Sequence, residues 1–100
     1  MNLGGWLAER RREAGMSQRE LAKRCALSPA YVAALERSTS DPPPLRTCRN
    51  MARALGLNWE EVWQRSFAAR LKRWLKREGC TNISDDEIFD ITRKIGPASR

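Results

Sequence analysis

The side chains with the clearest chemical potential in this sequence are its arginines and lysines. The chain carries 19 of them against 12 aspartates and glutamates, for a net charge of +7. Residues 1–80 hold 16 basic and 8 acidic side chains, whereas residues 81–100 hold 3 basic and 4 acidic. Cationic side chains neutralise phosphates and release counterions, so such a body favours a polyanionic partner. Charge alone is equally compatible with a basic surface that only contacts water.

The residues that most often perform catalysis are missing or scattered. The chain has no histidine, which removes the commonest general base and metal ligand. It also has no Cys-x-x-Cys pair and no glycine-rich phosphate loop. We therefore predict that the protein is not an enzyme and that it uses no cofactor and no metal.

The cysteines indicate a compartment. They stand at Cys25, Cys48 and Cys80, and an odd number argues against a disulfide framework and for a reducing environment. Cys25 and Cys48 fall on apolar stripes and are predicted core residues, whereas Cys80 follows a glycine and can be exposed. No apolar run is long enough to span a membrane, and there is no signal-peptide pattern. The predicted location is the cytoplasm, without membrane contact.

Two short helices joined by a tight turn are the most informative element. Ser17 can cap the first of them, and Glu20 can reach back to complete a capping box. Ser28 can cap the second, with Pro29 at the first helical position. The buried face of the pair is predicted to consist of Leu21, Ala22, Cys25, Val32 and Leu35. This arrangement can offer its second helix to the major groove of DNA.

Capping signals and apolar periodicity predict an all-α fold of six helices. Prolines 42–44 end the third helix, Gly56 ends the fourth, and Asn58 with Glu61 opens the long fifth. Ser84 and Glu87 form a further capping box. The predicted helices cover about 5–14, 17–25, 28–37, 45–55, 59–78 and 84–95, and the stripe of the last is Ile88, Ile91 and Ile95.

We predict a DNA-binding domain over residues 1–64 and a helical extension over 65–100, made of a basic helix (65–78) and an acidic helix (84–95). On the long fifth helix, one face is predicted to hold Trp63, Phe67, Leu71, Trp74 and Leu75, and the other Arg65, Lys72, Arg73 and Lys76. The aromatic face can pack on the core or form a dimer interface, and the basic face can be an accessory nucleic-acid contact. The acidic helix can fold back on the basic one or on its dimer mate.

Residues 5–64 resemble the lambda-repressor-like helix-turn-helix domain of the Cro/XRE type. The matching pieces run in order along the chain: Arg11, 15–22 (GMSQRELA), 27–29 (LSP), Val32, 35–37 (LER) and 51–57 (MARALGL). The resemblance implies a five-helix domain. It also implies a transcriptional regulator, usually a repressor, that binds two-fold operators in double-stranded DNA as a homodimer.

The same resemblance assigns roles to residues. Gln18 matches a position that contacts a phosphate or an outer base. The groove-facing positions of the recognition helix are Pro29, Ala30, Tyr31 and Ala34, and Ser28 at its start belongs to the same interface. Arg37 and Thr39 match a loop that meets phosphate. Arg11, Arg19 and Lys23 can each be a flank contact to the DNA backbone or part of a charged face that contacts only water. Glu36 is instead predicted to be structural, paired with an arginine such as Arg11.

The sequence departs from the family pattern at points that matter. Ala26 and Ser38 stand where glycine is usual, and a left-handed residue other than glycine costs about 1 kcal/mol. Ala30 and Ala34 cannot make the bidentate hydrogen bonds that read guanine or adenine, although they can touch thymine methyls. We therefore predict modest direct readout, with much of the affinity coming from phosphates and DNA shape.

The predicted function is a sequence-specific DNA-binding regulator, a repressor that acts as a homodimer on an inverted repeat. The alternative is a protein-interaction module, such as an antitoxin or adaptor, that binds a partner through its C-terminal helices.

Overall fold

The computed structural model describes residues 2–95, except for the side chain of Ile95. These residues form six α-helices and no strand, as the sequence predicts. None of the described helices has the length and apolar character needed to cross a membrane. The helices are α1 (Leu3–Glu13), α2 (Gln18–Cys25), α3 (Pro29–Glu36), α4 (Leu45–Leu55), α5 (Trp59–Arg77) and α6 (Asp85–Ile95). The predicted stop at Gly96 and Pro97 lies outside the described residues.

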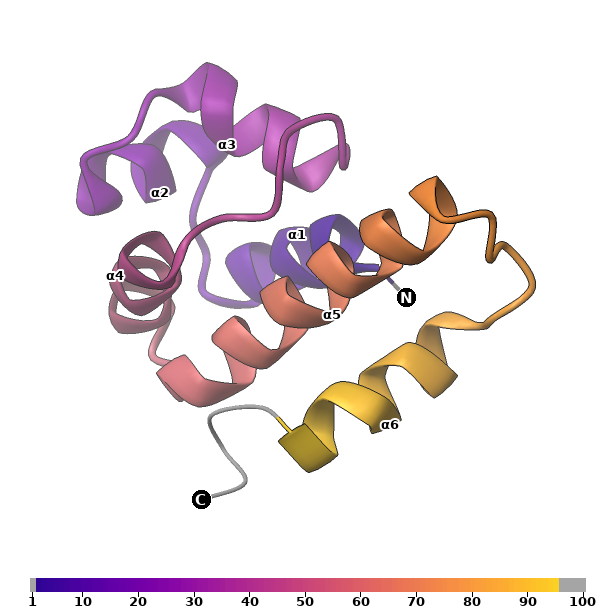
Figure 1. Cartoon of the computed structure of the whole chain (residues 1–100). Helices are drawn as coiled ribbons and strands as arrows, with labels where there is room; N and C mark the ends of the chain where they lie inside the picture. The colour runs from indigo at the N-terminus through magenta and orange to yellow at the C-terminus, as the bar shows by residue number, and fades with distance from the viewer. Residues whose placement is uncertain (1, 96–100) are drawn as a thin grey trace.

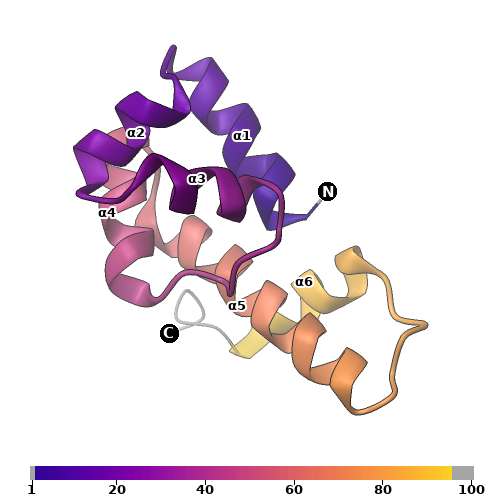
Figure 2. The same ribbon diagram turned by 90° about the horizontal axis from the view of Figure 1, so that it is seen from above.

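The first four helices surround one core, which the start of α5 closes (Figure 1). Helix α3 packs between α2 and α1, while α4 contacts both α2 and α5. The second half of α5 extends past this body, and α6 folds back along it (Figure 2). The buried cluster contains Trp6, Leu7, Leu21, Ala22, Cys25, Val32, Leu35, Cys48, Met51, Ala52 and Val62. All five residues predicted for the buried face of the helix pair are among them.

Helix α1 begins two residues earlier than predicted because Asn2 caps it. The Asn2 side-chain oxygen accepts the Gly5 N–H at 2.9 Å, which satisfies one of the free donors of the first turn. Gly4 allows α1 to approach α3 closely. A Cβ on Gly4 would lie 2.4 Å from the Glu36 carbonyl oxygen, so only glycine permits this close crossing.

The predicted capping boxes are formed in one case out of three. Ser84 and Glu87 exchange both bonds, at 2.9 and 3.1 Å. At the start of α2, Ser17 accepts the Glu20 N–H, but the Glu20 carboxylate turns to Arg24 Nε at 3.0 Å. At the start of α5, Asn58 caps through the N–H of Glu60 rather than through Glu61. One hydroxyl or amide acceptor therefore caps the start of α2 and of α5 without a reciprocal bond.

The buried face of α5 differs from the prediction. Val62 and Ser66 are fully buried, and Gln64 is 7% exposed, whereas the predicted aromatic face stays half-buried or open. Trp63 stacks on Phe67 with ring centroids 6.4 Å apart. Farther along the same helix, Trp74 is 53% exposed. Trp63 packs against the core cluster, so the alternative in which the aromatic face packs on the core holds at the start of this face and not at Trp74.

Small residues replace the aromatic ones on this face because α5 closely approaches the loop of residues 42–44, which holds three prolines and precedes α4. The Ser66 hydroxyl donates to the Pro43 carbonyl at 2.6 Å, and Arg70 Nη2 donates to the same oxygen at 3.0 Å. The Cys48 thiol of α4 also lies 3.5 Å from it. A buried carbonyl needs such partners, and a bulky ring at position 66 would exclude them.

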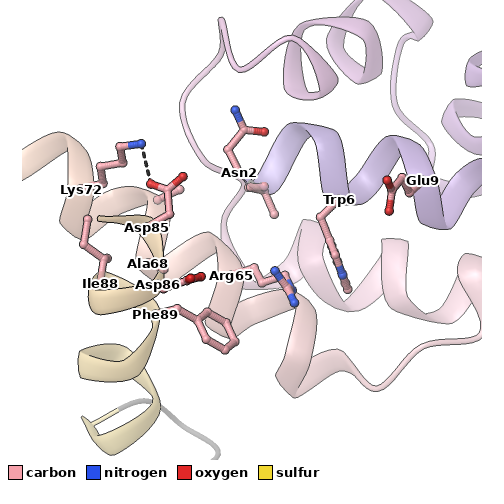
Figure 3. A pocket seen from close by; sticks show the side chains of 12 residues that line it. Asn2, Trp6, Glu9, Arg65, Ala68, Lys72, Asp85, Asp86, Ile88 and Phe89 are labelled. Carbon is pink, nitrogen blue, oxygen red and sulfur yellow. Dashed lines mark hydrogen bonds and ion pairs between the residues drawn. The ribbon is translucent and has the colours of Figure 1, made fainter. Parts of the chain in front are cut away.

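Helix α6 is attached to the body through an arginine (Figure 3). The Arg65 guanidinium lies over the Trp6 ring of α1 at 4.4 Å and over the Phe89 ring of α6 at 4.9 Å. Arg65 is therefore half-buried rather than on the water-facing side as predicted, and this burial lowers its pKa. A cavity of about 480 Å³ lies between α1, α5 and α6, and Arg65, Trp6 and Phe89 line it. Lys72 and Asp85, which also line this cavity, form an ion pair. The prediction that α6 folds back on α5 is confirmed.

The stripe of α6 is only partly as predicted. Ile88 is 1% exposed, but Ile91 is 41% exposed, and Thr92 is buried in its place. The Thr92 hydroxyl can be buried because it donates to the Phe89 carbonyl at 2.8 Å. The side chain of Ile95 is outside the description. The domain boundary predicted after residue 64 falls inside α5, so the extension continues the same helix.

Candidate nucleic-acid interface

The turn between α2 and α3 has the geometry of a helix-turn-helix unit. Ala26 ends α2 in the left-handed conformation, with φ 56° and ψ 42°. The Leu27 N–H then closes onto the Ala22 carbonyl at 2.9 Å. Ser28 caps α3 by accepting the Tyr31 N–H at 3.1 Å, and Pro29 occupies the first turn. The predicted turn is confirmed, including its left-handed alanine.

The outer face of α3 carries the predicted groove-facing residues. Val32 and Leu35 point into the core, with 2% and 3% exposure, which fixes the rotation of the helix. Exposed at its start are Ser28, Pro29 and Ala30, and half-buried beside them are Tyr31 and Ala34. Burial raises the pKa of the Tyr31 hydroxyl, so it is a neutral hydrogen-bond donor near pH 7.

A buried ion pair holds α3 against α1. Arg11 Nε and Nη2 donate to the two oxygens of Glu36 at 2.7 and 3.0 Å, which is the bidentate geometry of a strong pair. The side chains are 11% and 7% exposed. Arg11 Nη1 also donates to the Met16 carbonyl, and Gln18 Nε2 donates to Glu36 at 2.8 Å. Helices α1, α2 and α3 thus meet at one carboxylate, and Arg11 ties the linker between α1 and α2 to it, as the structural reading of Glu36 predicts.

This network changes what Arg11 and Gln18 can offer to DNA. All three guanidinium nitrogens of Arg11 are engaged inside the protein, so this side chain positions the helices and is not presented to phosphate. Gln18 uses one hydrogen of its side-chain amide for Glu36 and keeps the second for a ligand. Sequence reasoning found the Arg11–Glu36 pair but not the part of Gln18 in it, because nothing local links residues 18 and 36.

The pH dependence of stability should report on Glu36. Burial opposes its charge, but the hydrogen bonds from Arg11 and Gln18 and the charge of Arg11 outweigh burial and lower its pKa. A lowered folded pKa gives stability that is complete above the ordinary value of 4.5 and is lost as the pH falls through the folded value. In urea titrations from pH 7 to pH 3, the stability advantage of the wild type over Glu36→Gln should therefore shrink below about pH 4.5. Glu87, whose pKa is also lowered, is present in both proteins and cancels. An advantage independent of pH would contradict the assignment.

Basic and hydroxyl side chains surround the outer face of α3. Arg19 and Lys23 are exposed on α2, and Arg37 and Thr39 are exposed in the segment that follows α3. Within the described part of the chain, the cations Arg19, Lys23 and Arg37 have no ion pair. They are therefore available to an external anion, in contrast to Arg11.

The two left-handed residues give a stability prediction. Ala26 and Ser38 have φ of 56° and 60°, a conformation that costs a residue with a Cβ about 1 kcal/mol. Ala26→Gly and Ser38→Gly should each raise the free energy of unfolding by roughly 0.5–1 kcal/mol in urea denaturation. Ala33→Gly is the matched control, because a glycine inside α3 should lower stability by about 1 kcal/mol. Equal losses for all three variants would contradict the left-handed geometry.

The cysteines give a prediction of reactivity. Cys25 and Cys48 are buried and Cys80 is half-buried, and all three are free thiols. Burial raises the pKa of Cys25 and brings that of Cys48 to about 11, which suppresses the thiolate that reacts. Mass spectrometry after brief alkylation at pH 7.5 should find one adduct, at Cys80, in the native protein and three in urea. Native labelling of Cys48 would show that the α4–α5 contact opens.

Among the described residues, no group of cysteines and carboxylates suits a metal ion.

The comparison with known families agrees with this geometry. A family model described as helix-turn-helix matches residues 7–62, which is more than half of the chain. No curated protein and no solved structure matches at a significant level. The chain belongs to the Cro/XRE-type helix-turn-helix family. It is therefore a DNA-binding regulator whose partner is double-stranded DNA, and its family is not typically enzymatic.

Proposed function

We propose that this protein is a transcriptional repressor that binds an inverted-repeat operator as a homodimer in the cytoplasm. The observation that carries the proposal is the braced recognition helix. The buried Arg11–Glu36 pair and the Ser28 cap fix α3, while the start of this helix stays exposed. A rigid helix presented in this way can enter the major groove without further ordering.

The side chains on α3 set the kind of readout that we propose. Ala30 and Ala34 can contact thymine methyl groups, and Tyr31 can add one hydrogen bond. The second amide hydrogen of Gln18 and the cations Arg19, Lys23 and Arg37 then bind phosphates, with Thr39 beside them. Because phosphate contacts dominate this set, affinity should fall steeply with salt.

The dimer contact that we propose is the aromatic stripe of α5, defined by Trp63, Phe67, Leu71 and Trp74. Trp63, at the start of this stripe, packs against the core cluster, whereas Trp74 is 53% exposed at its far end. Burying such rings in a two-fold contact removes apolar area from water. The same open stripe supports the second candidate function, an antitoxin or adaptor that binds another protein there.

Self-association can be tested at the stripe. Trp74→Glu adds a charge at an exposed ring and should convert a sedimenting dimer into a monomer that folds normally. Leu45→Glu is the matched control, because Leu45 is a 40% exposed apolar residue on α4. A monomeric wild type would contradict the homodimer. Binding of a different protein that Trp74→Glu abolishes would favour the second candidate.

Operator binding is tested by selecting bound sequences from random duplex DNA at two salt concentrations. We expect an enriched inverted repeat with half-sites about 34 Å, or a multiple of it, apart. Tyr31→Ala should lose this enrichment, because it removes the only hydrogen-bonding side chain among the predicted base contacts of α3. Binding that enriches no sequence would contradict the proposal. A reporter promoter that carries the selected repeat then distinguishes repression from activation.

A further inference from the structure

A basic groove lies beside the helix-turn-helix unit, and its four cations, Lys72, Arg73, Lys76 and Arg77, lie beyond the part of the chain that the family model matches. It has a volume of about 600 Å³ and lies between the start of α1, the segment after α3 and the second half of α5. Its charged and hydroxyl lining consists of Ser38, Ser40, Lys72, Arg73, Lys76 and Arg77. None of its described lining residues is acidic.

The groove continues the face of α5 that packs on the core. Positions 62, 66, 69, 73 and 76 follow helical spacing and share one face of α5. Val62 and Ser66 are fully buried where α5 crosses the body, whereas Arg73 and Lys76 are exposed where it leaves. The face thus changes from small and apolar to cationic at the point where the protein stops covering it. The aromatic stripe points elsewhere, so a dimer contact would leave the groove open.

The cations of the groove are available to an external anion. Within the described residues, the side chains of Lys76 and Arg77 make no ion pair and no hydrogen bond. Arg73 pairs with Asp41 at 2.7 Å, but the two side chains are 50% and 89% exposed. Exposed pairs of this kind contribute little, so a phosphate can displace the carboxylate. Lys72 is paired in the same way with Asp85.

The groove also adjoins the segment that is expected to meet DNA. Ser38 and Ser40 flank Thr39, and Arg73 Nη1 donates to the Ser40 carbonyl at 3.4 Å. The segment after α3 lies against α5 (Figure 2), because Arg70 donates to the carbonyls of Pro42 and Pro43 at 3.2 and 3.0 Å. A DNA strand held by Arg37 and Thr39 would therefore continue directly toward Lys76 and Arg77.

We propose that this basic groove binds the sugar-phosphate backbone of the operator next to the half-site that α3 reads. The inference rests on the proposed operator binding and extends its interface beyond the family domain. The groove adds affinity without base recognition, because its ligands are phosphates. These additional phosphate contacts of the basic groove compensate for a recognition helix whose alanines make few hydrogen bonds to bases.

The test uses the full chain and the DNA sequence that the selection returns. Lys76→Gln/Arg77→Gln should lower affinity roughly 10-fold and reduce the slope of log K against log salt by about 2, since each lost phosphate contact removes about 0.9. The order of preference among mutated operators should not change. Hydroxyl-radical footprints should lose protection only at backbone positions next to the half-site.

The matched control is Arg46→Gln/Arg53→Gln. It removes the same charge from exposed positions on α4, away from the second half of α5 (Figures 1 and 2). If both double variants lose affinity equally, the groove has no special role and the inference fails, while operator binding stands. A loss explained by weaker self-association in sedimentation would also overturn it. A wild type that selects no sequence contradicts the proposed function itself, which is a different result.

Discussion

Glu36→Ala is expected to lower the free energy of unfolding by about 3–5 kcal/mol, because it leaves the Arg11 guanidinium buried without a counter-charge. The pair is only 11% and 7% exposed and is bidentate. Domains of this size have a total stability of about 5–15 kcal/mol, so the variant should be close to its limit. Urea denaturation at pH 7 measures the loss directly.

Two variants show whether the loss comes from the unpaired charge. Arg11→Met/Glu36→Leu removes both charges, and apolar replacement of a buried pair is often neutral or stabilising. It should therefore recover most of the stability. Glu13→Ala breaks the pair with Arg10, in which Glu13 is 64% exposed, and should cost at most about 0.5 kcal/mol. If Glu36→Ala cost no more than Glu13→Ala, the network could not be what braces α3.

The helix-turn-helix unit could be predicted because its information is local. Ser17, Ser28 and Pro29 start helices at positions that capping rules recognise, and the period of the apolar residues fixes which side is buried. The Arg11–Glu36 pair could also be predicted from the sequence, since an acidic residue beside a predicted core needs a cation as its partner. These features need no knowledge of how distant helices pack.

The second half of the chain could not be predicted in the same way. Hydrophobicity places the rings of Trp63 and Phe67 inside, but α5 approaches the loop before α4 so closely that this face admits only a side chain as small as Ser66. This close approach follows from the Pro43 carbonyl, which needs the Ser66 hydroxyl as a donor. The close crossing at Gly4 is a similar case. In both, one long-range contact decides against the local pattern.

The same reasoning explains why the sequence offers the basic face of α5 as an accessory nucleic-acid contact but does not show which of its cations form the groove. Charge content shows that the extension is basic, but Arg65 and Arg73 look equivalent there. The structure separates them, because Arg65 is held between two rings and Arg73 opens into the groove. Only the position of a cation relative to the body tells a structural arginine from one that can bind phosphate.

Ala30→Asp is expected to reduce operator affinity at least 100-fold while leaving the fold intact. Ala30 is exposed in the first turn of α3, where a carboxylate favours the helix dipole by about 0.3–1 kcal/mol. In the major groove of DNA the same carboxylate would face phosphates, and juxtaposed like charges cost several kcal/mol. Thr81→Asp, at an exposed position between α5 and α6, makes the same charge change and should bind almost as wild type. Fluorescence anisotropy gives the affinities, and thermal melting shows that both variants fold. Because Glu36→Ala acts through stability and Ala30→Asp does not, the two variants separate folding from recognition.

Ala30→Asp and Thr81→Asp could instead differ in operator affinity by less than about 3-fold, a gap below 1 kcal/mol. That result would mean that α3 does not enter the major groove of DNA.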